Sequence, residues 1–113
     1  MLPKRYRLST REIRSFFNYE YGKTNTDHLK IYFQKNVFNF PKFAVICKKD
    51  LFKKAVIRNK IKRRIHNAIN KIIKGKKIGN FNFIIIPEKK EIETEKFSQL
   101  IEKIKKSFIK FMI

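Results

Sequence analysis

Apolar and polar residues recur along this chain with two different periods, which separate helical from extended segments. Ser9 and Glu12 have the spacing of a capping box, so a helix is predicted to begin at Thr10, and Gly22 is expected to end it. Residues 28–34 alternate between apolar and polar side chains, which predicts a half-buried strand. The first third of the chain is therefore interpreted as a helix followed by a strand.

The remaining pattern continues this interleaving. Residues 43–47 form a nearly continuous apolar run, which predicts a strand covered on both faces, and residues 37–40 are a candidate for a further short strand. Residues 54–74 have helical periodicity, residues 81–86 form another strand, and Thr94 is expected to cap a final helix. The apolar stripe of that final helix contains Phe97, Leu100, Ile101, Ile104, Phe108 and Met112.

In chain order the predicted elements are a helix, two or three strands, a helix, a strand and a helix, written α-β-β-β-α-β-α. This interleaving predicts an α+β fold, specifically a two-layer α/β sandwich in which the helices cover a sheet. A chain of 113 residues offers enough material for one hydrophobic core. Residues 1–113 are therefore interpreted as a single domain.

The middle helix carries its apolar and charged side chains on different sides. At about 100° per residue, one stripe contains Ile57, Ile61, Ile65, Ala68, Ile69 and Ile72, and we expect it to face the sheet. Another side contains Arg58, Asn59, Lys62, Arg63, His66 and Asn70, and no acidic residue occurs between Leu51 and Pro87. A solvated helix face normally mixes charges, whereas this one combines arginine forks, lysines and amides that suit folded RNA.

The composition of the whole chain supports a polyanionic partner. Lysine and arginine total 29 against nine acidic residues, which gives a net charge of +20. Such an excess repels itself unless a polyanion neutralises it. Hydrophobic residues still make up 42% of the chain, enough for a packed core. The sequence therefore predicts a folded nucleic-acid-binding protein.

The sequence also predicts the cellular location of the protein and the redox state of its cysteine. Residues 1–10 are basic but lack the apolar stretch of a secretory signal, and no apolar run approaches the roughly 20 residues that span a bilayer. We expect a cytoplasmic protein that does not use a membrane as a partner. The sole cysteine, Cys47, lies in an apolar run and is expected to be a buried, reduced thiol.

Residues 55–63, AVIRNKIKR, closely resemble the R-N-x-x-K-R signature helix of the ribonuclease P protein family. Further similarity follows in the same order along the chain. Arg7 and Leu8 precede an aromatic helix, Lys48 and Lys49 end an aliphatic strand, and the run FIIIP at residues 83–87 follows the signature. Because small basic proteins have no general reason to share this succession, the chain is identified as resembling that family.

The resemblance implies both a fold and a function. Members of the family have an α/β sandwich with a left-handed βαβ crossover, an exception to the usual right-handed rule. The resemblance implies an accessory subunit of an endoribonuclease, not catalytic alone, that helps to remove the 5′ leader from precursor tRNA. The catalyst is then the RNA subunit, whose Mg²⁺ ions activate a water, and the implied partners are that catalytic RNA and the single-stranded leader, with no DNA and no metal bound by the protein alone.

Matching the motif residue by residue gives the expected contacts. The predicted catalytic-RNA contacts are Arg58, Asn59, Lys62, Arg63, Lys48, Lys49 and His66. His66 stands where the family usually has an arginine, so it is expected to be a weaker contact, neutral near pH 7 unless phosphate raises its pKa. Candidate leader contacts are Phe16, Phe17, Lys30 and Tyr32, and core packing explains Phe16 and Phe17 equally well.

Three other functions are weighed against this one. A protein-only enzyme is disfavoured because His28 and His66 belong to no motif and no metal-ligand cluster appears. A DNA-binding helix module is disfavoured by the strands. A small ribosomal-type RNA-binding protein with no catalytic association has the same charge and mixed fold, and it is the main alternative.

Overall fold

The computed structural model describes residues 2–26 and 28–113 of the chain. Within them the α-helices are α1 (Thr10–Phe16), α2 (Ala55–Gly75) and α3 (Phe97–Phe108), and the strands are β1 (Gly22–Asn25), β2 (Leu29–Lys35), β3 (Lys42–Val45) and β4 (Phe81–Pro87). Short 3-10 helices are η1 (Lys4–Tyr6), η2 (Lys90–Glu93) and η3 (Ile109–Phe111). The predicted α+β class is confirmed. The described helices and strands follow the order α-β-β-β-α-β-α, but the first of these strands is not one of the predicted ones.

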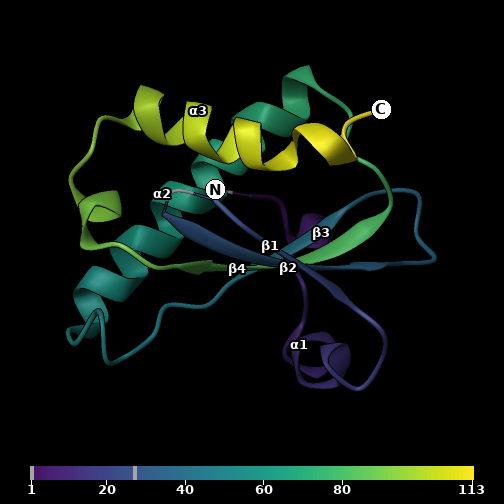
Figure 1. The fold of residues 1–113 in the computed structure, drawn as a ribbon, viewed down its shortest axis with the longest axis horizontal. Coiled ribbons are helices and arrows are strands. Elements are labelled where there is room, and N and C mark those ends of the chain that lie inside the picture. Colours follow the sequence, from purple (N-terminus) through teal and green to yellow (C-terminus); the bar gives the residue numbers. More distant parts are fainter. Residues whose placement is uncertain (1, 27) are drawn as a thin grey trace.

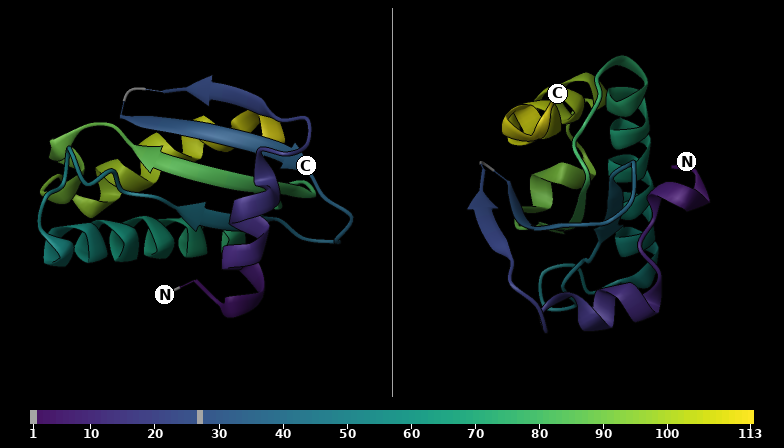
Figure 2. Two further views of the ribbon diagram at one scale, coloured as in Figure 1. Left: turned by 90° about the horizontal axis from the view of Figure 1, so that it is seen from below. Right: turned by 90° about the vertical axis from the view of Figure 1, so that its right-hand side faces the viewer.

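The strands form one sheet in the spatial order β1-β2-β4-β3. β2 pairs antiparallel with both β1 and β4, whereas β3 and β4 are parallel neighbours. α2 connects these two parallel strands. In the left view of Figure 2, β3 and β4 both run to the left and α2 returns behind them, while the chain advances from β3 to β4. Followed from β3 through α2 to β4, the chain therefore turns in the sense of a left-handed screw. The crossover is left-handed, as the family resemblance implied.

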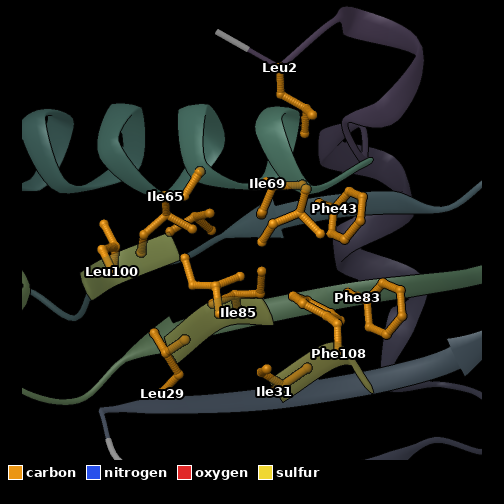
Figure 3. Packing of buried hydrophobic residues seen from close by; sticks show 14 of the residues in the cluster. Leu2, Leu29, Ile31, Phe43, Ile65, Ile69, Phe83, Ile85, Leu100 and Phe108 are labelled. Carbon is orange, nitrogen blue, oxygen red and sulfur yellow. The ribbon is translucent and has the colours of Figure 1, made fainter. Parts of the chain in front are cut away.

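Helices lie on both faces of the sheet, but unequally. α2 and α3 together cover one face, and the short α1 crosses the other (Figure 1). Alternation along β4 sorts its side chains accordingly, because Phe83 and Ile85 join the main core under α2 and α3, whereas Ile84 packs with Phe16 of α1. Figure 3 shows the main core, in which Ile65 and Ile69 of α2 meet these strand residues.

The position of α2 agrees with the sequence to within one residue at each end. Its buried side chains are Ile61, Ile65, Ala68, Ile69 and Ile72, all of which belong to the predicted apolar stripe, and Ile57 is partly buried against the same core. The described part of the chain contains no helix that is both long and apolar enough to cross a membrane.

The first helix is shorter than predicted. It begins at Thr10 with the predicted capping box, in which the Ser9 hydroxyl accepts from the amide of Glu12 at 3.1 Å, but it ends at Phe16. Gly22 does not terminate this helix and instead begins β1, a strand absent from the predictions. A Cβ atom at Gly22 would lie 2.2 Å from the ring of Phe33 on β2, so any larger residue at this position would displace that ring.

Two further expectations are wrong. Residues 37–40 form no strand; they belong to the loop between β2 and β3, where Asn36 donates through Nδ2 to the carbonyl oxygen of Phe40 at 3.2 Å. Thr94 does not cap the final helix, because it follows η2 as that element's C-cap. α3 begins at Phe97, after Lys96, without a side-chain cap bond.

Phe83→Ala is predicted to lower the free energy of unfolding by about 3–5 kcal/mol. The Phe83 ring is fully buried and contacts four other rings, those of Phe43, Phe81, Phe108 and Phe111. Urea unfolding followed by circular dichroism measures the change. Tyr19→Ala, at a side chain that is 69% exposed, is the control and should change stability by less than about 0.5 kcal/mol. Equal effects of the two substitutions would contradict the assigned core.

Candidate nucleic-acid interface

The basic side of α2 is fixed in place by the apolar side of the same helix. Because Ile61 and Ile65 are fully buried against the sheet, the residues between them must point elsewhere. We call the set Arg58, Asn59, Lys62 and Arg63 the signature face. Asn59 and Arg63 are exposed, and Arg58 and Lys62 are partly exposed. The structure therefore brings all four motif residues onto one accessible side of a single helix.

Arg58 also holds the segment that precedes α2. Its Nη1 donates to the carbonyl oxygen of Phe52 at 2.8 Å and to that of Lys53 at 2.9 Å. These bonds use two of the five N–H donors of the guanidinium. Arg58 thus positions the chain at the start of the signature face and keeps donors for a phosphate.

The predicted burial of Cys47 is confirmed, and its surroundings connect β3 to the signature face. The thiol lies 3.7 Å from the carbonyl oxygen of Arg58, to which it donates. Burial raises the pKa of the thiol, while the nearby charges of Lys62 and Arg58 partly oppose this effect. The raised pKa disfavours the reactive thiolate, so Cys47 packs as a small apolar residue.

His66 lies one helical turn beyond Lys62 in a position that disfavours its charged form. Burial, together with the charges of Arg7 and Lys62, lowers the pKa of His66 to about 4. Its Nδ1 atom is buried, with no hydrogen-bond partner among the described residues. The imidazole is therefore neutral near pH 7 in the free protein, as the sequence predicted.

The predicted contacts Lys48 and Lys49 lie in the segment between β3 and α2, directly after Cys47. Lys48 and Lys49 are exposed after β3, and Lys48 forms an ion pair of 3.1 Å with Glu88. Glu88 also pairs with Lys30 of β2 at 3.2 Å. Burial would raise the pKa of Glu88, but the hydrogen bonds from Lys48 and Lys30 hold it below its ordinary value. One carboxylate thus connects a predicted catalytic-RNA contact to a predicted leader contact.

Aromatic side chains gather on the sheet face that α1 crosses. Phe17, Tyr21 and Tyr32 form the aromatic patch, in which the ring centroids of Phe17 and Tyr32 are 5.1 Å apart and those of Tyr21 and Tyr32 are 5.6 Å apart. Phe17 and Tyr21 are each 45% exposed. Lys30 and Tyr32 lie two residues apart on β2 and therefore point to the same face. The patch and the Lys30–Glu88–Lys48 ion pairs thus border one side of the sheet.

The structure separates the two phenylalanines that the sequence treated alike. Phe16 is 1% exposed and packs with Ala44 and Ile84, so it belongs to the core. Phe17 points outward, and its backbone segment is held by Gln34, whose Nε2 donates to the carbonyl oxygens of Phe16 at 2.8 Å and Glu20 at 3.2 Å. Core packing therefore accounts for Phe16, while Phe17 stays a candidate for base stacking.

Tyr21 is a member of the patch that the sequence did not indicate as a candidate. The helix was expected to continue to Gly22, which placed Tyr21 on a helix end with no relation to Tyr32. The available signal was the spacing of Phe17 and Tyr21 before a glycine, because a turn there returns the chain toward β2. The pairing of Gly22 with Phe33 brings Tyr21 beside Tyr32.

The acidic residues around these surfaces do not form a metal site. No group of three or more His, Cys, Asp or Glu side chains within residues 2–26 and 28–113 is arranged to hold a metal ion. Glu12 is bound by Lys42 at 2.9 Å, and Glu88 by two lysines. Both of these carboxylates are therefore paired with lysine ammonium groups.

Comparison with known proteins identifies similar sequences and folds. A family model described as Ribonuclease P matches residues 2–112. The ribonuclease P protein component of Rickettsia bellii (strain RML369-C) is 43% identical over 63 residues, which cover 56% of this chain and about half (52%) of that protein.

Solved structures of the same family have the same fold. The RNase P protein from Thermotoga maritima superimposes with a TM-score of 0.79 at 26% identity, covering 92% of this chain and 96% of that one. The Staphylococcus aureus RNase P protein, at 20% identity and a TM-score of 0.71, covers 93% of each chain and supports the fold alone.

His66 gives a prediction about stability and pH. Its folded-state pKa of about 4 lies below the ordinary value near 6.5, so the unfolded chain takes up the proton first as the pH falls. The stability associated with neutral His66 is fully present above pH 6.5 and is lost progressively between pH 6.5 and 4. His66→Gln is expected to reduce the loss of unfolding free energy between pH 7 and 4.5, measured by urea denaturation. Identical pH dependence in both proteins would contradict the assigned environment.

Proposed function

This chain belongs to the ribonuclease P protein family, and from that membership we propose that it binds two RNA elements at once. The first is the catalytic RNA of ribonuclease P, contacted by the signature face of α2. The second is the single-stranded 5′ leader of precursor tRNA, contacted by the aromatic patch and its neighbouring lysines. The observation that carries the proposal is the presence of both surfaces, each made by a different element, on one chain whose family model covers residues 2–112. That coverage disfavours the ribosomal-type alternative.

The signature face has the chemistry of a structured-RNA contact. Arg58 and Arg63 offer planar forks suited to two phosphate oxygens, and Lys62 offers a point charge. Asn59 adds a donor and an acceptor that can contact a ribose hydroxyl or a base edge. Residues 51–87 contain no Asp or Glu. No acidic side chain of α2 therefore neutralises these cations.

The leader contact rests on stacking and on exchangeable ion pairs. Exposed aromatic faces stack unpaired bases for about 1–3 kcal/mol per base without requiring a sequence. Partly exposed ion pairs such as Lys30–Glu88 contribute only about 0–1 kcal/mol, so leader phosphates can replace Glu88. We expect Phe17, Tyr21 and Tyr32 to hold bases, and Lys30 and Lys48 to hold phosphates.

The protein contributes affinity and position rather than a reacting group. Magnesium ions, where the RNA subunit binds them, would supply an activated water for the hydrolysis. This chain has no metal-binding cluster within its described residues, and we assign it no step of the hydrolysis. Its contribution is to neutralise phosphate charge between two RNA molecules and to immobilise the leader.

Purified protein added to a bacterial ribonuclease P RNA is expected to restore 5′ cleavage of precursor tRNA at a magnesium concentration chosen so that the RNA alone does not cleave. The physical reason is that protein cations replace part of the counterion charge that magnesium otherwise supplies. Gel analysis of end-labelled precursor measures cleavage and its position. No stimulation, or cleavage at a different phosphodiester, would refute the proposal.

Phe17→Ala combined with Tyr32→Ala is expected to weaken holoenzyme binding of a long-leader precursor by about 1–3 kcal/mol for each base stack lost. Binding of a precursor with a one-nucleotide leader should be unchanged, because that leader is too short to reach the patch. Tyr19→Ala is the matched control, since Tyr19 is exposed but makes no ring contact with the patch among the described residues. An equal loss with both leaders would contradict the proposed leader contact at the aromatic patch.

A further inference from the structure

The loop between β2 and β3 exposes apolar side chains that do not belong to the aromatic patch. Val37 is 95% exposed and Phe38 is 38% exposed. The loop lies at the end of the sheet where α1 crosses it, beside the N-terminal segment (Figure 2, left). An exposed aromatic ring in a loop of a highly charged protein suggests a contact surface.

The exposure does not result from a loosely held loop. Asn36 fixes the loop at both ends, because its Nδ2 donates to the carbonyl oxygen of Phe40 at 3.2 Å and its Oδ1 accepts from the amide of Phe38 at 3.0 Å. The same Nδ2 reaches Oδ1 of Asn82 on β4 at 3.0 Å, and the Asn36 amide donates to the carbonyl oxygen of Asn80 at 3.0 Å. The rings are therefore held in position before any partner binds.

Three rings of this region form a connected group that we call the loop platform: Tyr6, Phe38 and Phe40. Phe38 and Phe40 stack with ring centroids 5.6 Å apart and an interplanar angle of 26°, and Tyr6 meets Phe40 edge-on at 5.8 Å. Two cations border them. Lys42 Nζ lies 4.8 Å from the centroid of Phe38, and the Arg5 guanidinium lies 5.8 Å from that of Phe40.

The charge around the loop platform is almost entirely positive. A neighbouring hollow of about 510 Å³ is lined by Lys4, Arg5, Arg7, Leu8, Ser9, Thr10, Glu12 and Lys42. Its one acid, Glu12, is bound by Lys42 through both carboxylate oxygens at 2.9 Å. A second hollow beside the platform is lined by Tyr6 and Phe40 together with Ile73 near the end of α2 and the two lysines that follow that helix, Lys76 and Lys77. The loop platform therefore lies beside the C-terminal end of α2, the helix that carries the signature face.

We propose that the loop platform binds an unpaired nucleotide of the catalytic RNA, with its base stacked on Phe38 and its phosphate held by Arg5 and Lys42. This inference rests on the proposed function and extends it to a third surface. A stacked aromatic pair bordered by cations is the chemistry that holds single-stranded nucleic acid without sequence preference. The position of the loop platform beside α2, the helix that carries the signature face, favours the catalytic RNA over the leader. No ring contact among the described residues joins the loop platform to the aromatic patch.

The test is the affinity of the full-length chain for ribonuclease P RNA as a function of salt, compared between wild type and Phe38→Ala. Removing the stack is expected to weaken binding about 5- to 150-fold at fixed salt. The slope of log affinity against log salt should stay unchanged, because no phosphate contact is removed. Phe38→Trp should bind like the wild type, and Val37→Ala, which removes exposed apolar surface without a ring, is the matched control with no expected loss.

Each other result would overturn the inference. If Phe38→Ala and the wild type bind the RNA with equal affinity, no base stacks on Phe38. If the wild-type protein itself does not bind the RNA, the proposed function is refuted instead. Equal losses in Phe38→Ala and Val37→Ala would indicate a general apolar contact. A loss confined to long-leader precursor would assign the site to the leader. A wild-type dimer that Phe38→Ala dissociates, measured by sedimentation velocity, would show that a second copy of the chain is the occupant.

Discussion

The packing of one side of α2 against the sheet is the interaction on which the rest of the structure depends. Ile61, Ile65 and Ile69 are each almost fully buried, and each contributes about 1.5–3 kcal/mol by leaving water. Repulsion between like charges one turn apart, as between Arg58 and Lys62, costs about 0.2–0.5 kcal/mol per pair. Burial therefore far outweighs the repulsion, and the helix can carry an unneutralised basic side that is fixed in rotation by its apolar side.

The acidic residues that form ion pairs do not reduce the positive charge of the signature face. The described ion pairs join Glu12 to Lys42, Glu88 to Lys30 and Lys48, Glu93 to Lys60, and Glu95 to Lys103. None of them includes a residue of the signature face. These carboxylates hold lysines in position, and the partly exposed ones can give way to phosphate because such pairs contribute little stability.

Long periodic segments could be predicted from the sequence, and elements that depend on distant partners could not. The apolar stripe of α2 defined both its position and its buried side. β1 was missed because Lys23, Thr24 and Asn25 have no apolar pattern, and this strand exists through its pairing with β2. Residues 37–40 resembled a strand because three of the four are apolar, yet hydrogen bonds with Asn36 hold them in a loop. The motif indicated which residues of α2 to examine, and the neutrality of His66 was expected. The lowered pKa of His66 and the hydrogen bonds of Arg58 to the preceding segment, however, depend on tertiary contacts.

The central claim is that the signature face neutralises RNA phosphates, and the salt dependence of binding to ribonuclease P RNA tests it most directly. Lys62→Ala and Lys106→Ala make the same chemical change, one on the signature face and one at an exposed position of α3. The account predicts that Lys62→Ala makes the slope of log affinity against log salt shallower by about 0.7–0.9, the value of one lost phosphate contact, while Lys106→Ala leaves it unchanged. Equal slopes for Lys62→Ala and the wild-type protein would contradict the account.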